Sequence, residues 1–230
     1  MADSREKIII GNCSGFYGDR LSAARDMVDG GPIDVLTGDY LAELTMTILY
    51  NQKMKRGDDQ GYVGTFLKQF KDVAVSCQEK NIKIVTNAGG LNPSSMAKKI
   101  EEIIQELNLN LKVAYIDGDD LIPRIEELKE ALDAGADVVV CPRVTDAAVV
   151  IGPAAWKYNW SRDNYDALAG ALAAGHIIEC GAQATGGNYS FFHEVPSFFN
   201  IGYPIAEIYE DGSFTITKHC LLYTSDAADE

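Results

Sequence analysis

Five short apolar runs alternate along the chain with segments of helical periodicity, and this alternation limits the available folds. The runs are nearly continuous in β-branched and aliphatic residues, and they cover residues 7–13, 33–37, 81–86, 111–116 and 137–141. Strands with helices on both faces have this pattern, because neither face meets water. The sequence therefore predicts an α/β fold: a parallel β-sheet flanked by helices, Rossmann-like, open and doubly wound.

Helices are expected between these strands. In one of them, Phe66, Phe70, Val73 and Cys77 recur at helical spacing and share a face. Asn92 followed by a proline is typical of a helix start. The expected helices are 19–28, 40–56, 63–79, 93–107, 123–134, 147–156 and 165–179.

The pattern changes after residue 200. Residues 204–218 alternate with period two around Asp211 and Gly212, which predicts a β-hairpin that begins a second region. We therefore expect an α/β domain over 1–200, the start of a truncated second region over 201–219 and a separate tail over 220–230. The tail sequence LLYTSDAADE (221–230) resembles translated sequencing-adapter read-through, so we expect an artefact beyond which the natural protein continues. A disordered acidic terminus is the alternative.

Composition narrows the class of partner. The chain has 34 acidic and 20 basic residues, a formal net charge of −14. Nucleic acid and anionic membranes require a basic face, so we expect neither as a partner. The five cysteines form no CxxC pair, which favours reduced thiols in the cytoplasm. The polar start lacks signal-peptide architecture, and no apolar run reaches the ~20 residues that span a bilayer. We expect a soluble cytoplasmic protein, and a homo-oligomer is compatible with the sequence.

The ends of the strands define the candidate site, because parallel sheets bind ligands beyond the carboxyl ends of their strands. All five strands end in small or polar residues, among them Asn12, Cys13, Ser14, Thr37, Asp120 and Thr145. The candidate catalytic residues are Asp39, Asn87, Asp117, Asp119, Arg143, Asp146 and, at the end of a helix, Glu179. Glycines that would let a ligand approach the backbone are Gly15, Gly38, Gly89, Gly90 and Gly118.

Several of these residues have structural alternatives, which the sequence leaves open. Asp39 and Thr145 stand where a helix N-cap is wanted. Arg143 would bind a substrate carboxylate or phosphate, or else pair with a neighbouring acid. The acidic loop 117–120 would bind Mg²⁺ through one or two carboxylates, or lie exposed, so the metal ligands stay unknown.

Named catalytic motifs are missing. The glycines after the first strand do not have the dinucleotide-binding spacing, and the sequence contains no phosphate-binding loop, nucleophile elbow or HExxH motif. His176 and Cys180 lie four residues apart on one helix, either as a nucleophile pair or as packed core.

Six segments, taken together and in order, are similar to those of a known family. They are GGPIDVLTGDYLAELTM (30–46), IVTNAGGLNP (84–93), YIDGDDL (115–121), RVTDAA (143–148), AGHIIECGAQATGGN (174–188) and GYPIAEI (202–208). Over residues 8–219 the chain resembles the amino-terminal part of the acyclic terpene utilisation protein A (AtuA-type) family. The resemblance implies a part in bacterial monoterpene catabolism, which passes through acyl-coenzyme A (acyl-CoA) thioesters and a biotin-dependent geranyl-CoA carboxylase. It brings no catalytic residues with it.

The chain departs from the family pattern at two places. The pattern has a longer excursion, with an Asn-Ala-Tyr-Leu-Gly stretch, where residues 121–133 here connect directly. It should also continue with Pro-Gly-Thr-Gly-Gly after His219, where the tail begins.

Three functions follow as hypotheses. The first is an enzyme or enzyme subunit acting on acyclic isoprenoid or branched-chain acids at the acyl-CoA level. The second is a non-catalytic assembly or binding partner of an acyl-CoA carboxylase. The third is a divalent-metal-dependent hydrolase or lyase that uses the acidic strand ends.

Overall fold

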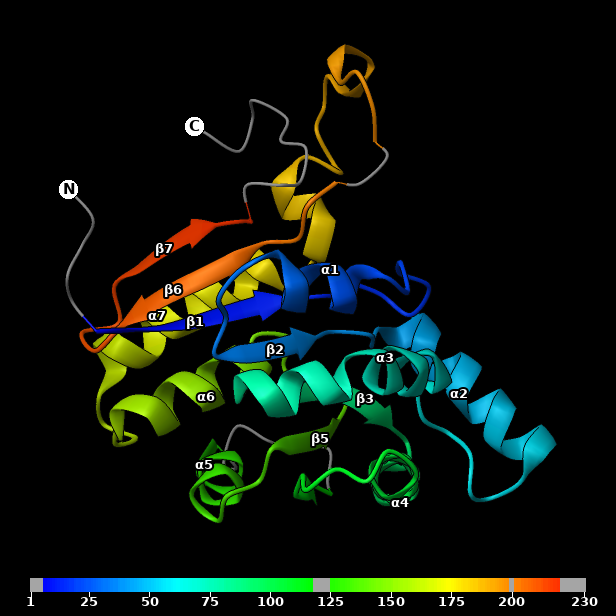
Figure 1. Ribbon diagram of the computed structural model, residues 1–230. Helices are drawn as coiled ribbons and strands as arrows, with labels where there is room; N and C mark the ends of the chain where they lie inside the picture. The colour runs from blue at the N-terminus through cyan, green and yellow to red at the C-terminus, as the bar shows by residue number, and fades with distance from the viewer. Residues whose placement is uncertain (1–5, 118–124, 199–200, 220–230) are drawn as a thin grey trace.

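A computed structural model describes residues 6–117, 125–198 and 201–219. Seven strands form one sheet in the order β4-β5-β3-β2-β1-β6-β7 (Figure 1). The strands are β1 (Lys7–Asn12), β2 (Val35–Gly38), β3 (Lys83–Gly90), β4 (Val113–Tyr115), β5 (Val138–Pro142), β6 (Ile205–Tyr209) and β7 (Phe214–Thr217). The predicted tail lies outside the described residues, as do Gly118, Asp119 and Asp120.

The helices follow the strands in the predicted alternation. They are α1 (Ala23–Gly30), α2 (Glu43–Arg56), α3 (Gly64–Lys80), α4 (Pro93–Glu106), α5 (Ile125–Asp133), α6 (Ala148–Tyr158) and α7 (Tyr165–Ile178). Two short 3-10 helices, Gly181–Thr185 and Phe192–Glu194, come after α7. Within the described ranges, no helix combines the length and apolar character needed to cross a membrane.

The five predicted strands are parallel. β1 pairs with β2, β2 with β3, β3 with β5, and β5 with β4, each in parallel register. The prediction of an α/β fold with a mostly parallel sheet is confirmed. The last two strands run the other way: β6 is antiparallel to β1 and β7 is antiparallel to β6, as the arrowheads in Figure 1 show for β1 and β6. The Rossmann-like assignment and the division into regions stay predictions, and β6 extends the same sheet as β1.

Successive residues of the central strands enter two separate cores, which explains their nearly continuous apolar character. On one face, Leu36 and Ile84 join a core that includes Phe70 of α3 and Ile100 of α4. On the other face, Val35 and Val85 join a core built with α6 and α7. Each such buried side chain contributes about 1.5–3 kcal/mol relative to an exposed one. Helices therefore cover both faces of the sheet (Figure 1).

The structure resolves which of the polar residues cap helices. Asn92 is a cap, because its side-chain oxygen accepts a hydrogen bond from the backbone N–H of Ser95 at 3.2 Å. Asp39 is not a cap, because α2 begins only at Glu43. Thr145 is also outside the N-cap position of α6, which Ala147 occupies. Capping therefore does not account for Asp39.

Candidate functional site: a cluster of three carboxylates

Three carboxyl groups converge at the carboxyl ends of the parallel strands. Asp39 follows β2, Asp146 follows β5, and Glu179 directly follows α7. One carboxylate oxygen from each lies within 4.8 Å of the others. All three residues are among the candidate catalytic residues predicted from the sequence. Because β2 and β5 run parallel in the same sheet, Asp39 and Asp146 lie at the same ends of their strands.

Asp39 is the buried member of the cluster, with only 4% of its surface exposed. Its Oδ1 atom accepts hydrogen bonds from Nδ2 of Asn87 and from the backbone N–H of Leu41, the latter at 3.2 Å. Asn87 lies in β3, and its own Oδ1 accepts the backbone N–H of Tyr40 at 2.9 Å. This second bond fixes which end of the Asn87 amide faces Asp39. Asn87 therefore orients the Asp39 carboxyl.

Burial raises the pKa of Asp39 to about 7, although the hydrogen bonds from Asn87 and Leu41 lower it. The negative charges of Asp146 and Glu179 raise this pKa further. A carboxyl group with a pKa near 7 is present in both protonation states around neutral pH. It is therefore able both to give and to take a proton.

Asp146 and Glu179 are half-buried neighbours, and their side chains hydrogen-bond each other. Burial raises the pKa of Asp146, and the charge and hydrogen bond of Glu179 raise it further, while the charge of Arg143 lowers it. Asp146 therefore holds its proton more readily than an isolated aspartate does.

Cys180 is beside this pair. Its Sγ donates to Oε1 of Glu179 at 3.4 Å, and burial together with Glu179 raises the pKa of the thiol to about 11. The thiol is thus protonated at neutral pH, and His176 is exposed. These two features disfavour the nucleophile-pair hypothesis for His176 and Cys180.

Arg143 is at the rim of the site. Its Nη2 atom lies 2.5 Å from Oε1 of Glu43, the first residue of α2, and both side chains are exposed. Sequence reasoning does not single out Glu43. The sequence feature that could have identified Glu43 is its position in the first turn of the helix after β2, where an acidic side chain is favoured.

A comparison with family models gives a match to the acyclic terpene utilisation family protein AtuA over residues 8–130 and 126–221. The chain belongs to this family. The two matched segments overlap at residues 126–130. This overlap lies inside the connection 121–133, where the sequence departs from the family pattern. Comparisons with curated proteins and with solved structures returned no match.

A further predicted residue of this AtuA-family chain, Asp117, does not belong to the described cluster. Asp117 is exposed and follows β4, the edge strand, which β5 and β3 separate from β2. Gly118 and Asp119 lie outside the described residues.

The predicted glycines Gly15, Gly38, Gly89 and Gly90 stand at or just after the carboxyl ends of their strands and pack tightly against protein atoms. A Cβ on Gly15 would lie 2.5 Å from the backbone carbonyl of Cys180. Gly90 has a φ of +54°, which favours glycine. At Gly38 and Gly89 a Cβ would meet Tyr40 and the backbone oxygen of Cys141. Packing within the chain accounts for these four glycines, and a ligand-binding role stays a prediction.

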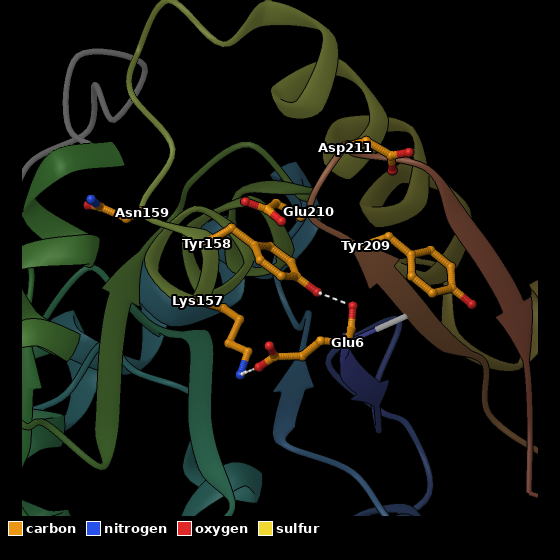
Figure 2. Close-up of a pocket in the computed structure, with 7 residues that line it drawn as sticks. All are labelled: Glu6, Lys157, Tyr158, Asn159, Tyr209, Glu210 and Asp211. Carbon is orange, nitrogen blue, oxygen red and sulfur yellow. Dashed lines mark hydrogen bonds and ion pairs between the residues drawn. The ribbon is translucent and has the colours of Figure 1, made fainter. Parts of the chain in front are cut away.

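A cavity of about 660 Å³ lies at the other end of the sheet (Figure 2). Its walls are Glu6 before β1, residues Lys157, Tyr158 and Asn159 at the end of α6, and Tyr209, Glu210 and Asp211 at the turn after β6. In it, Lys157 pairs with Glu6 at 2.5 Å, and the Tyr158 hydroxyl donates to the Glu6 carbonyl at 3.3 Å. None of the three clustered carboxylates lines this cavity. The carboxylate cluster is the candidate functional site, because ligands of parallel sheets bind at the carboxyl ends of the strands.

Proposed function

We propose that this AtuA-family protein is an enzyme, or an enzyme subunit, in the catabolism of acyclic isoprenoid or branched-chain acids at the acyl-CoA level. In this proposal the Asp39, Asp146 and Glu179 carboxyls transfer protons at the substrate. The observation that supports it is the cluster itself: three carboxyl oxygens within 4.8 Å, from three separate elements of the fold. Gathering like charges in a half-buried place opposes folding. Such arrangements are typical of functional sites.

Acyl-CoA thioesters offer a chemistry that fits these groups. The hydrogens on the carbon next to the thioester carbonyl are acidic for C–H bonds. When one C–H bond breaks, the proton passes to an ionised carboxylate, and the electron pair moves onto the thioester oxygen as an enolate. A protonated carboxyl of the same cluster then returns a proton. General acid–base help of this kind contributes about 10²- to 10⁴-fold in rate.

The first test is solvent exchange. The full chain is incubated with citronellyl-CoA in D₂O, and deuterium at the carbon next to the carbonyl is measured by mass spectrometry. We expect incorporation with the wild type and a rate on the order of 100-fold lower with Glu179→Gln, which keeps the shape of the side chain and removes its basicity. Glu210→Gln is the matched control, since Glu210 lies in the cavity at the other end of the sheet and should leave the rate unchanged.

The opposite result would change the assignment. If the wild type exchanges no deuterium but co-purifies with a biotin-dependent carboxylase, the non-catalytic partner hypothesis is the better one. Equal exchange rates for the wild type and Glu179→Gln would show that the carboxylate cluster takes no part in the proton transfer.

A divalent-metal-dependent hydrolase or lyase is the second candidate, favoured by the spacing of the three oxygens. Oxygen ligands of Mg²⁺ lie about 2.1 Å from the ion, and the ion usually keeps several waters alongside one or two carboxylates. Three oxygens within 4.8 Å of one another have the chemistry and nearly the spacing of such a ligand set. A bound cation would polarise a substrate carbonyl.

Thermal unfolding with millimolar Mg²⁺ or Mn²⁺ tests this second candidate. Binding at 100 times Kd adds about 2.7 kcal/mol to the free energy of unfolding, which raises Tm by roughly 5–10 °C in a chain of this size. The rise should be largely lost in Asp146→Asn, which keeps the volume and removes one charge. A Tm that neither cation moves would rule out the metal site and leave proton transfer.

A further inference from the structure

We infer that Asn12 is a positioning residue that holds Glu179 against Asp39. This inference rests on the proposed function, in which the carboxylate cluster is the reacting centre. Asn12 is the last residue of β1, and only 1% of its surface is exposed. Its side chain contacts both of the elements that deliver these two carboxyls.

The first contact is to the end of α7. Nδ2 of Asn12 donates to the backbone oxygens of Ile178 at 2.6 Å and of Glu179 at 3.2 Å. The last four carbonyl groups of a helix have no partner within the helix, and a buried carbonyl without a partner is unfavourable. The two hydrogens of the Asn12 amide therefore bond to the carbonyls of Ile178 and Glu179, and the second of these residues carries the clustered carboxylate.

The second contact is to β2. Thr37 lies two residues before Asp39, and its Oγ1 lies 3.4 Å from both Oδ1 of Asn12 and the backbone oxygen of Gly11, which share its one hydrogen as acceptors. The backbones are also joined, because Cys13 N–H donates to the Thr37 oxygen at 2.9 Å and Asp39 N–H donates to the Ser14 oxygen at 3.0 Å. The end of β1 is thus a short bridge between the backbone of Asp39 and that of Glu179.

An amide is the side chain that fits this place. It presents its donor end to the carbonyls of α7 and its acceptor end to the hydroxyl of Thr37. An aspartate would set an oxygen against those carbonyls, and a leucine would donate to neither. Loss of the amide leaves the end of α7 without these bonds, so Glu179 is free to move away from Asp39. A displacement of about 1 Å in a catalytic group reduces rates by on the order of 100-fold.

Asn12→Leu tests the inference, read by the pKa of Asp39 in carboxyl ¹³C NMR titrations. The negative charges facing Asp39 belong to Asp146 and Glu179, and both raise its pKa. Glu179→Gln should lower the pKa of Asp39 by removing one charge, and Asn12→Leu should lower it by moving that charge away. In the double variant, Asn12→Leu should add no further shift, because Asn12 acts through Glu179. The deuterium exchange rate should fall about 10- to 100-fold with Asn12→Leu.

Ile10→Ala is the matched control, in the same strand and equally buried. It should lower Tm without moving the pKa of Asp39, whereas Asn12→Leu should change both. If Asn12→Leu does not fold, Thr37→Val decides, since it removes the hydroxyl shared between Asn12 Oδ1 and the Gly11 carbonyl and should shift the pKa the same way by a smaller amount. An unchanged pKa in the folded variant, or a full shift that persists without the Glu179 charge, overturns the inference.

The two proposals fail separately. If the pKa of Asp39 responds as expected but the wild type exchanges no deuterium, the positioning role stands and the proposed function is wrong. If the wild type exchanges deuterium and Asn12→Leu changes neither rate nor pKa, the function stands and the positioning role is wrong.

Discussion

Asp39→Asn is expected to raise the free energy of unfolding at pH 8, although it removes a residue of the candidate site. At that pH the wild type keeps a charged carboxylate in a buried place beside two other acids. Asparagine has the same shape and no charge, and its oxygen still accepts the bonds from Asn87 and Leu41. The pKa of Asp39 rises from 3.8 to about 7 on folding. At about 1.4 kcal/mol per pH unit, this shift sets an upper limit of about 4 kcal/mol on the gain.

The raised pKa of Asp39 determines how the unfolding free energy changes with pH. Because the pKa of Asp39 is higher in the folded state, the folded protein binds this proton more tightly than the unfolded chain does. The resulting stabilisation is fully present below about pH 4 and is lost as the pH rises through about 7. The difference in unfolding free energy between Asp39→Asn and the wild type should therefore grow between pH 4 and pH 8.

Urea unfolding at pH 5, 6, 7 and 8 measures this difference. Asp59→Asn is the matched control, because Asp59 is exposed in a loop and the same chemical change there should give curves parallel to those of the wild type. Parallel curves for Asp39→Asn as well would contradict the raised pKa. The same variant should lose deuterium exchange, so stability and activity should move in opposite directions, as in many functional sites.

The sequence predicts that the candidate site lies at the carboxyl ends of the parallel strands. Five apolar runs separated by helical segments predict parallel strands, and the polar carboxyl ends of parallel strands lie on the same side of the sheet. Asp39 and Asp146 meet for this reason. Asn92 and the proline after it predict the start of α4 correctly, because an N-cap is a local signal.

Strand order could not be predicted, and it decides which acids meet. The loop after β4 is as acidic as any other strand end, yet β4 is the edge strand and Asp117 is exposed there. Order depends on packing between distant segments, which no local pattern contains. Asp39 shows a related limit: a polar residue between a strand and a helix resembles a cap, but α2 starts four residues later. The position of Asn12 under α7 is likewise a tertiary feature.

Gly15→Ala is expected to reduce both stability and activity, because the loop after β1 packs against the backbone that follows α7 at this residue. A Cβ at Gly15 would lie 2.5 Å from the carbonyl carbon and oxygen of Cys180 and 2.9 Å from the nitrogen of Gly181. These are backbone atoms, so no side chain can rotate to make room. The Gly15 loop is itself held, because the Gly15 N–H donates to Oδ2 of Asp19 at 2.9 Å. Forcing an extra methyl into a packed place costs about 1–3 kcal/mol.

The contact, and not the backbone conformation, carries this prediction, since Gly15 is not among the glycines with positive φ. The strain should push the backbone of Cys180 away from the Gly15 loop and take Glu179 with it, so the deuterium exchange rate should fall along with Tm. Gly64→Ala is the matched control: Gly64 begins α3, and nothing lies within 4 Å of its added Cβ. There alanine should be neutral or stabilise by up to about 1 kcal/mol through helix propensity. If Gly15→Ala unfolds at the same urea concentration as Gly64→Ala and keeps the wild-type exchange rate, the close contact between the Gly15 loop and the backbone of Cys180 does not hold the site together.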